Sequence, residues 1–197
     1  SQDALVAELQ SRKGAGISGW QSYWLVNAIA VTGTEDAIRE LAARPDVDVV
    51  EVDLQPELIE PVKVDRPAGK DAAGIGITPG VVSVGARRVW DELGIRGDGA
   101  LIGSLDTGVD GNHPALADRW RGNFAPAEEC WLDVVYGGSA TPTDNQGHGT
   151  HTVGTMAGIA PDDTIGIAPE ALWIAANAID QGANPGFDND ILECLQF

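Results

Sequence analysis

The sequence predicts an α/β fold: a parallel sheet covered by helices, preceded by a smaller α+β unit. In residues 81–197, apolar strand-like runs alternate with helical patterns, which is typical of a parallel sheet. We expect a strand over 100–106, a helix over 149–158, a strand over 171–179 and a helix over 189–197. Residues 55–80 are rich in Pro and Gly and show no apolar period, so they are predicted to form a linker between the two parts.

The first half of the N-terminal unit is expected to contain a helix and two strands. Leu5 and Leu9 lie on one face of the helix, and Ser1 is its candidate N-cap. Residues 22–31 are rich in β-forming side chains and predict a strand, which follows a short strand near 17–20.

The second half of this unit, which spans residues 1–54, is expected to be a helix and a final strand. Thr32 and Glu35 have the spacing of a capping box, and Pro45 prevents the helix from continuing. The alternation in residues 46–54 predicts the strand. The order helix, strand, strand, helix, strand matches a ferredoxin-like unit that lacks its first strand.

The composition excludes several classes of function. The chain has 197 residues, of which 43% are hydrophobic, and this favours a globular protein over a disordered one. The net charge is -18, and residues 122–197 contain no Lys or Arg, so neither nucleic acid nor an anionic membrane surface is an expected partner. No apolar run is long enough to predict a membrane span. Two interpretations of the acidic charge stay open: solubility in a salty or calcium-rich medium, or a preference for basic substrates in an acidic cleft.

Cysteines give little support for a disulfide scaffold, because Cys130 and Cys194 are the only two. Cys194 lies in an apolar helical pattern, which favours a buried free thiol. A single bridge between the two cysteines is the alternative, and it would indicate an oxidising compartment. The N-terminal residues lack the pattern of a signal peptide, so such a segment was either removed or never present.

Asp106 is the first candidate functional residue. It ends an apolar strand, Leu101–Leu105, at the position where an open α/β sheet presents functional groups. A buried carboxylate there needs a hydrogen-bond donor or a positive charge to stay ionised. In a purely structural role, Asp106 would cap a turn through the amides of Thr107 and Gly108.

His148 is the second candidate. It lies between two glycines just before a predicted helix, whose N-terminus favours a neutral imidazole. A neutral imidazole accepts a proton from a nucleophile near physiological pH. Its other ring nitrogen then needs a fixed acceptor, and the carboxylate of Asp106 is a suitable one.

The other two histidines are assigned structural roles. His151 follows His148 at helical spacing, and H-x-x-H together with an aspartate is one pattern that binds zinc. The usual helical metalloprotease motif contains a Glu that is absent here, so a packed and hydrogen-bonded His151 is expected instead. His113 is expected to lie in a turn.

The two blocks around these residues resemble a known family. "SLDTGVDGNHPAL" around Asp106 and "GHGTHTVGTMAG" around His148 are similar to the aspartate and histidine blocks of subtilisin-like serine proteases, and most similar to bacillopeptidase F-type enzymes. The resemblance covers about residues 80–197 and implies that 81–197 form the N-terminal half of a subtilisin-like parallel-sheet catalytic domain. It implies that Asp106 orients the imidazole, and that His148 is the general base and acid acting on a protein or peptide substrate. It also implies a secreted or cell-surface location.

The N-terminal residues resemble the propeptide of the same family. The similar stretches are "YWLVNAIAV" and "LAARPDVDVVEVD". The resemblance implies a propeptide that is bound to its own catalytic domain, with Asp53–Glu60 as the tail that lies in the active-site cleft. Self-cleavage is expected near Leu58–Glu60.

The nucleophile of the family is not found in this sequence. The family's serine lies in a block G-T-S-x-[AS]-x-P, and that block does not occur here. The chain is therefore expected to be the N-terminal portion of a zymogen, with the serine supplied beyond Phe197 or by another chain. The C-terminal remainder of the catalytic domain is then a partner. The alternative is a catalytically dead assembly that acts as an inhibitor or binding module through its propeptide-like domain.

No cofactor is required for this chemistry, and calcium is considered only as a structural ion. Where the family often has an aspartate that helps to hold a tight calcium ion, this chain has Ala115. The loop after the helix predicted over 149–158, residues 157–169, is also short, so the usual tight site is expected to be absent. Asp162 and Asp163 are candidates for a weaker ion, and solvated acids are the alternative.

Overall fold

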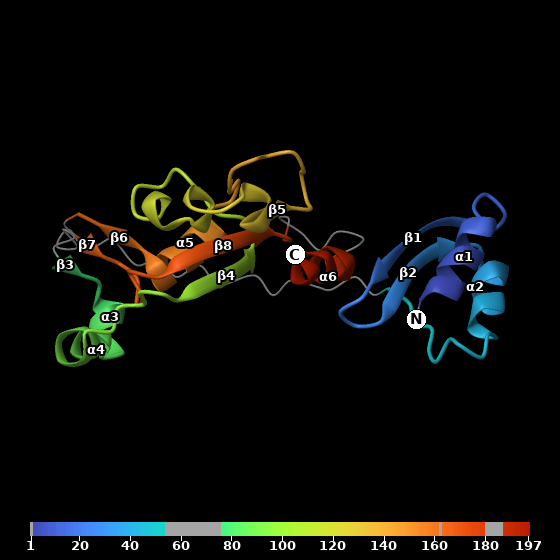
Figure 1. The fold of residues 1–197 in the computed structure, drawn as a ribbon, viewed down its shortest axis with the longest axis horizontal. Coiled ribbons are helices and arrows are strands. Elements are labelled where there is room, and N and C mark those ends of the chain that lie inside the picture. The colour runs from blue at the N-terminus through green and yellow to red at the C-terminus, as the bar shows by residue number, and fades with distance from the viewer. Residues whose placement is uncertain (1, 54–75, 162, 180–186) are drawn as a thin grey trace, which may run out of the picture.

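The computed structural model describes residues 2–53, 76–161, 163–179 and 187–197 (Figure 1). The α-helices are α1 Asp3–Ser11, α2 Glu35–Ala42, α3 Pro79–Ser83, α4 Ala86–Leu93, α5 His148–Ala157 and α6 Phe187–Gln196. The strands are β1 Ile17–Tyr23, β2 Ala28–Gly33, β3 Gly76–Ile77, β4 Leu101–Asp106, β5 Trp131–Asp133, β6 Ile159–Ala160, β7 Asp163–Thr164 and β8 Leu172–Asn177. The four elements predicted for the C-terminal part correspond to β4, α5, β8 and α6.

A parallel three-stranded sheet organises the C-terminal part, as the alternation of strands and helices predicts. Its strand order is β4-β8-β5, and both pairs of neighbours are parallel. The register places Asp106, Asn177 and Asp133 side by side at the carboxyl ends of the three strands. Polar side chains from all three strands therefore meet at one edge of the sheet.

The core beneath this edge is built around a tryptophan on the central strand. Trp173 is fully buried, donates its ring N–H to the carbonyl oxygen of Leu116 at 2.9 Å, and packs against Trp120 with ring centroids 6.4 Å apart. Val153 brings α5 into the same cluster. Because a buried indole needs an acceptor for its N–H, the bond to Leu116 fixes the loop after β4 against the sheet.

The N-terminal unit is a hairpin covered by α1 and α2. Strands β1 and β2 pair antiparallel, and Leu9, Ile17 and Leu41 form the buried cluster beneath them. The strand predicted over 22–31 is wrong, because Asn27 adopts a positive φ of 51° and turns the chain back. Asn tolerates that left-handed conformation better than most residues, so one predicted strand becomes a turn and part of two strands.

Both predicted helix caps of this unit lie elsewhere. Thr34 rather than Thr32 is the N-cap of α2, and its hydroxyl accepts from the amide of Ala37. Thr32 belongs to β2 and pairs across the hairpin. At α1 the N-cap position is held by Gln2 without a side-chain cap, and Ser1 lies outside the described residues.

The final strand of the N-terminal unit is not formed in residues 46–53. Val49, Val50 and Val52 are all exposed there, so no buried face selects an extended register. The described residues supply two paired strands and two helices, and a ferredoxin-like unit stays a prediction. The boundaries at residues 54 and 80 also stay predictions, although β3 and the start of α3 fall within the expected linker.

Helix α6 lies between the parallel sheet and the N-terminal unit (Figure 1). The side-chain oxygen of Gln196 accepts from the amides of Trp24 at 2.6 Å and Leu25 at 3.4 Å, at the turn between β1 and β2. Asn189 donates to a carboxylate oxygen of Asp53 at 3.1 Å. The N-terminal unit therefore contacts the C-terminal part at α6, with polar groups of Gln196 and Asn189 among the contacts.

Cys130 and Cys194 are both buried and free, which agrees with the prediction for Cys194. Burial raises the pKa of the Cys194 thiol to about 12, with further contributions from nearby carboxylates that include Glu193 and Asp190. This thiol is therefore protonated and unreactive at neutral pH. Among the helices that the structure describes, none is long and apolar enough to cross a bilayer.

Candidate active site

Strand β4 carries Asp106 to the polar edge of the sheet. Its side chain is 11% exposed, and one carboxylate oxygen, Oδ1, accepts from the amide of Thr107 at 2.7 Å. The backbone carbonyl of Asp106 accepts from Ala178 at 3.0 Å, which ties this strand end to the loop after β8. Asp106 thus makes the contact with the Thr107 amide that a structural role predicts. The same oxygen, Oδ1, also accepts a contact from outside the sheet.

Helix α5 begins at His148 and brings the imidazole to that oxygen. Nδ1 of His148 lies 2.7 Å from Oδ1 of Asp106. Because a carboxylate only accepts hydrogen bonds, Nδ1 carries the proton in this contact, and Nε2 keeps its lone pair. The His148 side chain is 68% exposed, so the ring presents a basic nitrogen beside the sheet edge.

Two glycines make this close approach possible. Gly149, in the first turn of α5, is buried against the end of β4, where an added Cβ would collide with the carbonyl oxygen of Gly108. Gly108 has a positive φ of 96°, and a Cβ there would collide with the carbonyl oxygen of Thr143. Glycine at 149 lets the helix meet the strand end at backbone contact distance, and glycine at 108 does the same for the loop at Thr143.

Asp144, which the sequence analysis did not single out, links the same two elements. Its Oδ1 accepts from the Thr107 hydroxyl at 3.0 Å, and its Oδ2 accepts from the amide and hydroxyl of Thr150 at 2.9 and 2.6 Å. The Thr107 hydroxyl in turn accepts from the amide of Gly149 at 3.0 Å. The available signal was an aspartate three residues before the helix N-cap, the spacing at which a carboxylate reaches first-turn amides.

The remaining predicted site residues have mixed outcomes. His151 is exposed, so the expectation of a packed histidine is wrong. His113 lies in a turn as predicted, and its Nδ1 accepts from the amide of Ala115 at 3.2 Å. Within the described ranges, no three His, Cys, Asp or Glu side chains are grouped so that they could hold a metal ion. Asp162 lies outside the described residues.

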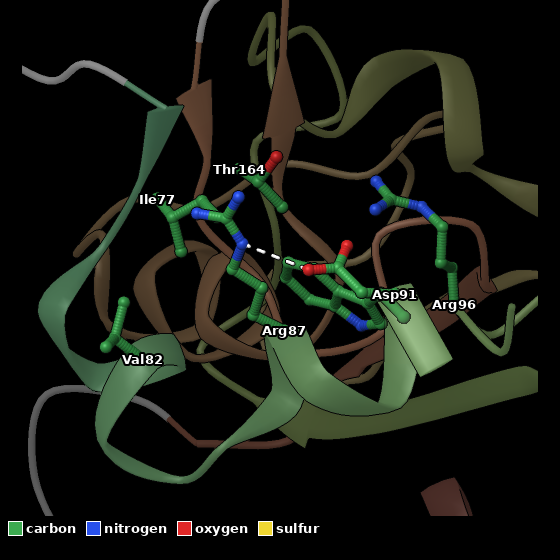
Figure 2. Close-up of a pocket in the computed structure, with 7 residues that line it drawn as sticks. Ile77, Val82, Arg87, Asp91, Arg96 and Thr164 are labelled. Atoms are coloured by element: carbon green, nitrogen blue, oxygen red, sulfur yellow. Dashed lines mark hydrogen bonds and ion pairs between the residues drawn. The ribbon is translucent and has the colours of Figure 1, made fainter. Parts of the chain in front are cut away.

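A separate hollow of about 500 Å³ lies between β3, β7, α3 and α4, and its lining includes neither Asp106 nor His148. Figure 2 shows Arg87 beside Asp91, with which it forms an ion pair of 3.2 Å. Arg96 lies over the Trp90 ring, 4.8 Å from its centroid, and pairs with Glu170 at 2.7 Å. Both arginines of the hollow already have carboxylate partners. The pair of Asp106 and His148 is therefore the stronger candidate for an active site.

Comparisons with known proteins bear on this pair. The sequence model of the Subtilase family matches residues 97–194. Bacillopeptidase F of Bacillus subtilis (strain 168) is 36% identical over 205 residues, which cover 98% of this chain and 14% of that protein. Minor extracellular protease Vpr of the same organism is 33% identical over 133 residues, covering 64% of this chain and 16% of Vpr. Thermitase of Thermoactinomyces vulgaris is 35% identical over 107 residues, covering 53% and 34%. The chain therefore spans a minor part of the length of each of these relatives.

Proposed function

The chain belongs to the subtilase family, and from this premise we propose that it carries the aspartate and histidine of a subtilisin-like serine endopeptidase. The observation that carries the proposal is the 2.7 Å contact between His148 Nδ1 and Asp106 Oδ1. In acyl transfer by such enzymes, a serine hydroxyl attacks the peptide carbonyl while an imidazole removes its proton. The same imidazole then returns the proton to the leaving amine.

Each residue of the pair has a separate role in this mechanism. His148 accepts the serine proton at Nε2, the ring nitrogen that does not face Asp106. The imidazolium that forms carries a positive charge, which the carboxylate of Asp106 stabilises across the Nδ1 contact. The largely buried position of Asp106 strengthens that interaction, because less water screens it.

The serine itself comes from outside residues 1–197. No G-T-S-x-[AS]-x-P block occurs in the sequence, so the proposal places the nucleophile beyond Phe197 or in another chain. The exposed imidazole of His148 supports this assignment, since the serine must reach Nε2 from the solvent side. The C-terminal remainder of the catalytic domain is thus a required partner.

The N-terminal unit acts as a propeptide in this proposal, and the protein is a zymogen. Support comes from the bonds of Gln196 to Trp24 and Leu25 and from the bond between Asn189 and Asp53. These contacts hold the unit on α6 and bring the last described residues of its tail to the same helix. Release of the unit then requires that these polar contacts be exchanged for water.

The remaining proposals concern surroundings and substrate. The substrate is a protein or peptide, and the location is secreted or cell-surface, as the name of extracellular protease Vpr indicates for that relative. No cofactor enters the chemistry, and calcium has at most a structural role. The acidic charge makes nucleic acid an unfavourable partner.

A second candidate function is a serine-less assembly that binds or inhibits a peptidase through the propeptide-like unit. The missing serine block is the observation that favours it. The two functions differ in one measurable property, the presence of a serine that His148 activates.

Labelling of the full-length protein with a fluorophosphonate probe tests the proposed function. The probe reacts with activated serines, so we expect covalent labelling of one serine outside residues 1–197 in the matured protein. His148→Ala is expected to abolish both the labelling and the self-cleavage, while the exposed His151→Ala keeps both. A matured protein that stays unlabelled would overturn the enzyme proposal in favour of the binding one.

A further inference from the structure

Asp144 is hydrogen-bonded on both sides of the junction between β4 and α5. Oδ1 accepts from the Thr107 hydroxyl, and also from the amides of Gln146 and Gly147 at 3.0 and 2.8 Å. Oδ2 accepts only from the amide and the hydroxyl of Thr150. One oxygen therefore holds the residue after Asp106, and the other holds the first turn of the helix that carries His148.

The network continues through both threonine hydroxyls. Thr107 donates to Asp144 and accepts from the amide of Gly149, so its single hydroxyl bridges the carboxylate and the helix. Thr150 donates to Asp144 and accepts from the amide of Asp110 at 2.9 Å. Each hydroxyl thus donates to Asp144 and accepts from a backbone amide across the junction, Thr107 from Gly149 of α5 and Thr150 from Asp110 in the loop after β4.

This arrangement replaces the ordinary capping of α5. The helix has Gly147 at its N-cap, which has no side chain to satisfy the first-turn amides. Those of Gly149 and Thr150 are satisfied by Thr107 and Asp144, which lie outside the helix. A local cap would fix only the helix, whereas these two groups fix the helix relative to the strand.

We propose that Asp144 is a positioning residue, which holds the His148 imidazole at hydrogen-bond distance from Asp106 by clamping the start of α5 to the end of β4. This inference rests on the proposed function, since it assigns Asp144 a part in that reaction. Its physical basis is that His148 reaches Asp106 only while the first turn of α5 keeps its place. A displacement of about 1 Å at such a contact lowers turnover by about 10²-fold.

The ionisation state of Asp144 suits this role. Burial alone raises the pKa of its carboxyl, but hydrogen bonds from Thr150, Gly147 and Gln146 outweigh burial and leave the pKa below its usual range. Asp144 is therefore a carboxylate at neutral pH, and both of its oxygens are available as acceptors.

The test reads the tautomer of His148 directly, in the full-length protein labelled with ¹⁵N-histidine. Asp144→Asn keeps one acceptor oxygen and replaces the other with an amide donor, so it loses either the Thr107 side or the Thr150 side of the clamp. In the unaltered chain we expect the two ring nitrogens of neutral His148 to give well-separated ¹⁵N shifts, with the proton on Nδ1. In Asp144→Asn we expect these shifts to converge, because the proton exchanges between Nδ1 and Nε2.

A matched pair at Thr107 keeps the test decisive if Asp144→Asn does not fold. Thr107→Val removes the bridging hydroxyl without changing the size of the side chain and is expected to reproduce the convergence. Thr107→Ser retains the hydroxyl and should restore the shifts of the unaltered chain. Ser139→Ala is the control from the same loop, because among the described residues the Ser139 hydroxyl bonds within its own turn, to Thr141.

The outcomes separate this inference from the proposed function. In the full-length enzyme, Asp144→Asn is expected to lower kcat by about 10²-fold with little change in KM. Unchanged ¹⁵N shifts in folded Asp144→Asn or Thr107→Val would overturn the positioning role. A protein whose His148 tautomer depends on Asp144, but which never hydrolyses peptides, would overturn the proposed function and leave the structural clamp in place.

Discussion

Two carboxyl groups in different regions have pKa values shifted in opposite directions: Asp144, at the strand edge that holds Asp106, and Asp190, on α6 beside the N-terminal unit. At the strand edge, Asp144 is surrounded by donors and its pKa is lowered. On α6, burial raises the pKa of Asp190, and the neighbouring carboxylate of Glu193 raises it further. Burial likewise raises the pKa of Tyr23, which faces that helix, with added effects of Glu193, Asp190 and Asp53.

The difference indicates which contact in the molecule is held strongly and which is weak enough to separate. Hydrogen bonds to a charged carboxylate contribute about 1.5–3 kcal/mol each, so the junction of β4 and α5 is strongly held. Asp190 and Glu193 carry like charges on α6, close to Asp53 and Tyr23 of the N-terminal unit, so the contact weakens as these groups ionise. Such a contrast suits a zymogen whose catalytic residues are already in place before its propeptide leaves.

The largest loss of stability is expected from Gly149→Ala, which disrupts the contact between α5 and the end of β4. The added Cβ collides with the carbonyl oxygen of Gly108, so we expect a loss of about 3 kcal/mol in the free energy of unfolding. Urea unfolding of the full-length protein measures it. Gly154→Ala, on the same helix with open space around its Cβ, should instead stabilise the chain by about 0.5–1 kcal/mol. Equal effects of the two substitutions would contradict the close approach.

A smaller effect is expected from Gln196→Ala, which weakens the contact between α6 and the N-terminal unit. The variant removes the oxygen that accepts from Trp24 and Leu25, and such bonds contribute about 1 kcal/mol each. Hydrogen exchange should show lower protection of the Trp24 amide, while Gln10→Ala on the exposed surface of α1 leaves it unchanged. Equal protection in Gln196→Ala would mean that the unit is held by other contacts.

The smallest effect is a pH dependence of opposite sign in the two regions. The pKa of Asp190 is raised, so its stabilisation is present below its unfolded value of 3.8 and is lost as the pH rises through the folded value. The pKa of Asp144 is lowered, so its stabilisation is present above 3.8 and is lost as the pH falls through the folded value. Protection factors should therefore decrease with rising pH at Trp24 and with falling pH at Thr150. Asp190→Asn should remove only the first dependence.

The sequence predicted the strand edge better than the N-terminal unit for a physical reason. The run 172–177 is apolar and mostly buried by the sheet, and 101–106 keeps an apolar pattern although Leu101 is exposed, so both leave a signal in the sequence. The turn at Asn27 depends on one backbone angle, and the β-forming side chains on both sides of it leave no break in the sequence pattern. The tail at 46–53 alternates as well, but within the described residues no strand pairs with it, so the pattern alone predicted a strand that does not form there.

Within the site, the contact of Asp106 with His148 followed from the chemistry that each side chain needs. The role of Asp144 did not follow, because its partners Thr107 and Thr150 become neighbours only when the chain folds. His151 was misjudged because helical spacing does not say which helix face meets the sheet. A carboxylate shortly before a helix with a glycine N-cap is the signal that would have found Asp144.

The most direct measurement compares Asp106→Asn with Asp133→Asn in the full-length protein. Both aspartates flank Asn177 at the same sheet edge, but only Asp106 contacts His148. The bonds of Asp133 to Val135, Tyr136 and Asn177 all use Oδ1, an acceptor that asparagine retains.

We expect kcat/KM for a peptide substrate to fall about 10⁴-fold in Asp106→Asn, because the amide selects the wrong tautomer of His148. In Asp133→Asn it should stay within about threefold of the unaltered protein. Equal losses in the two variants, or an active Asp106→Asn, would contradict the claim that Asp106 orients His148 for catalysis.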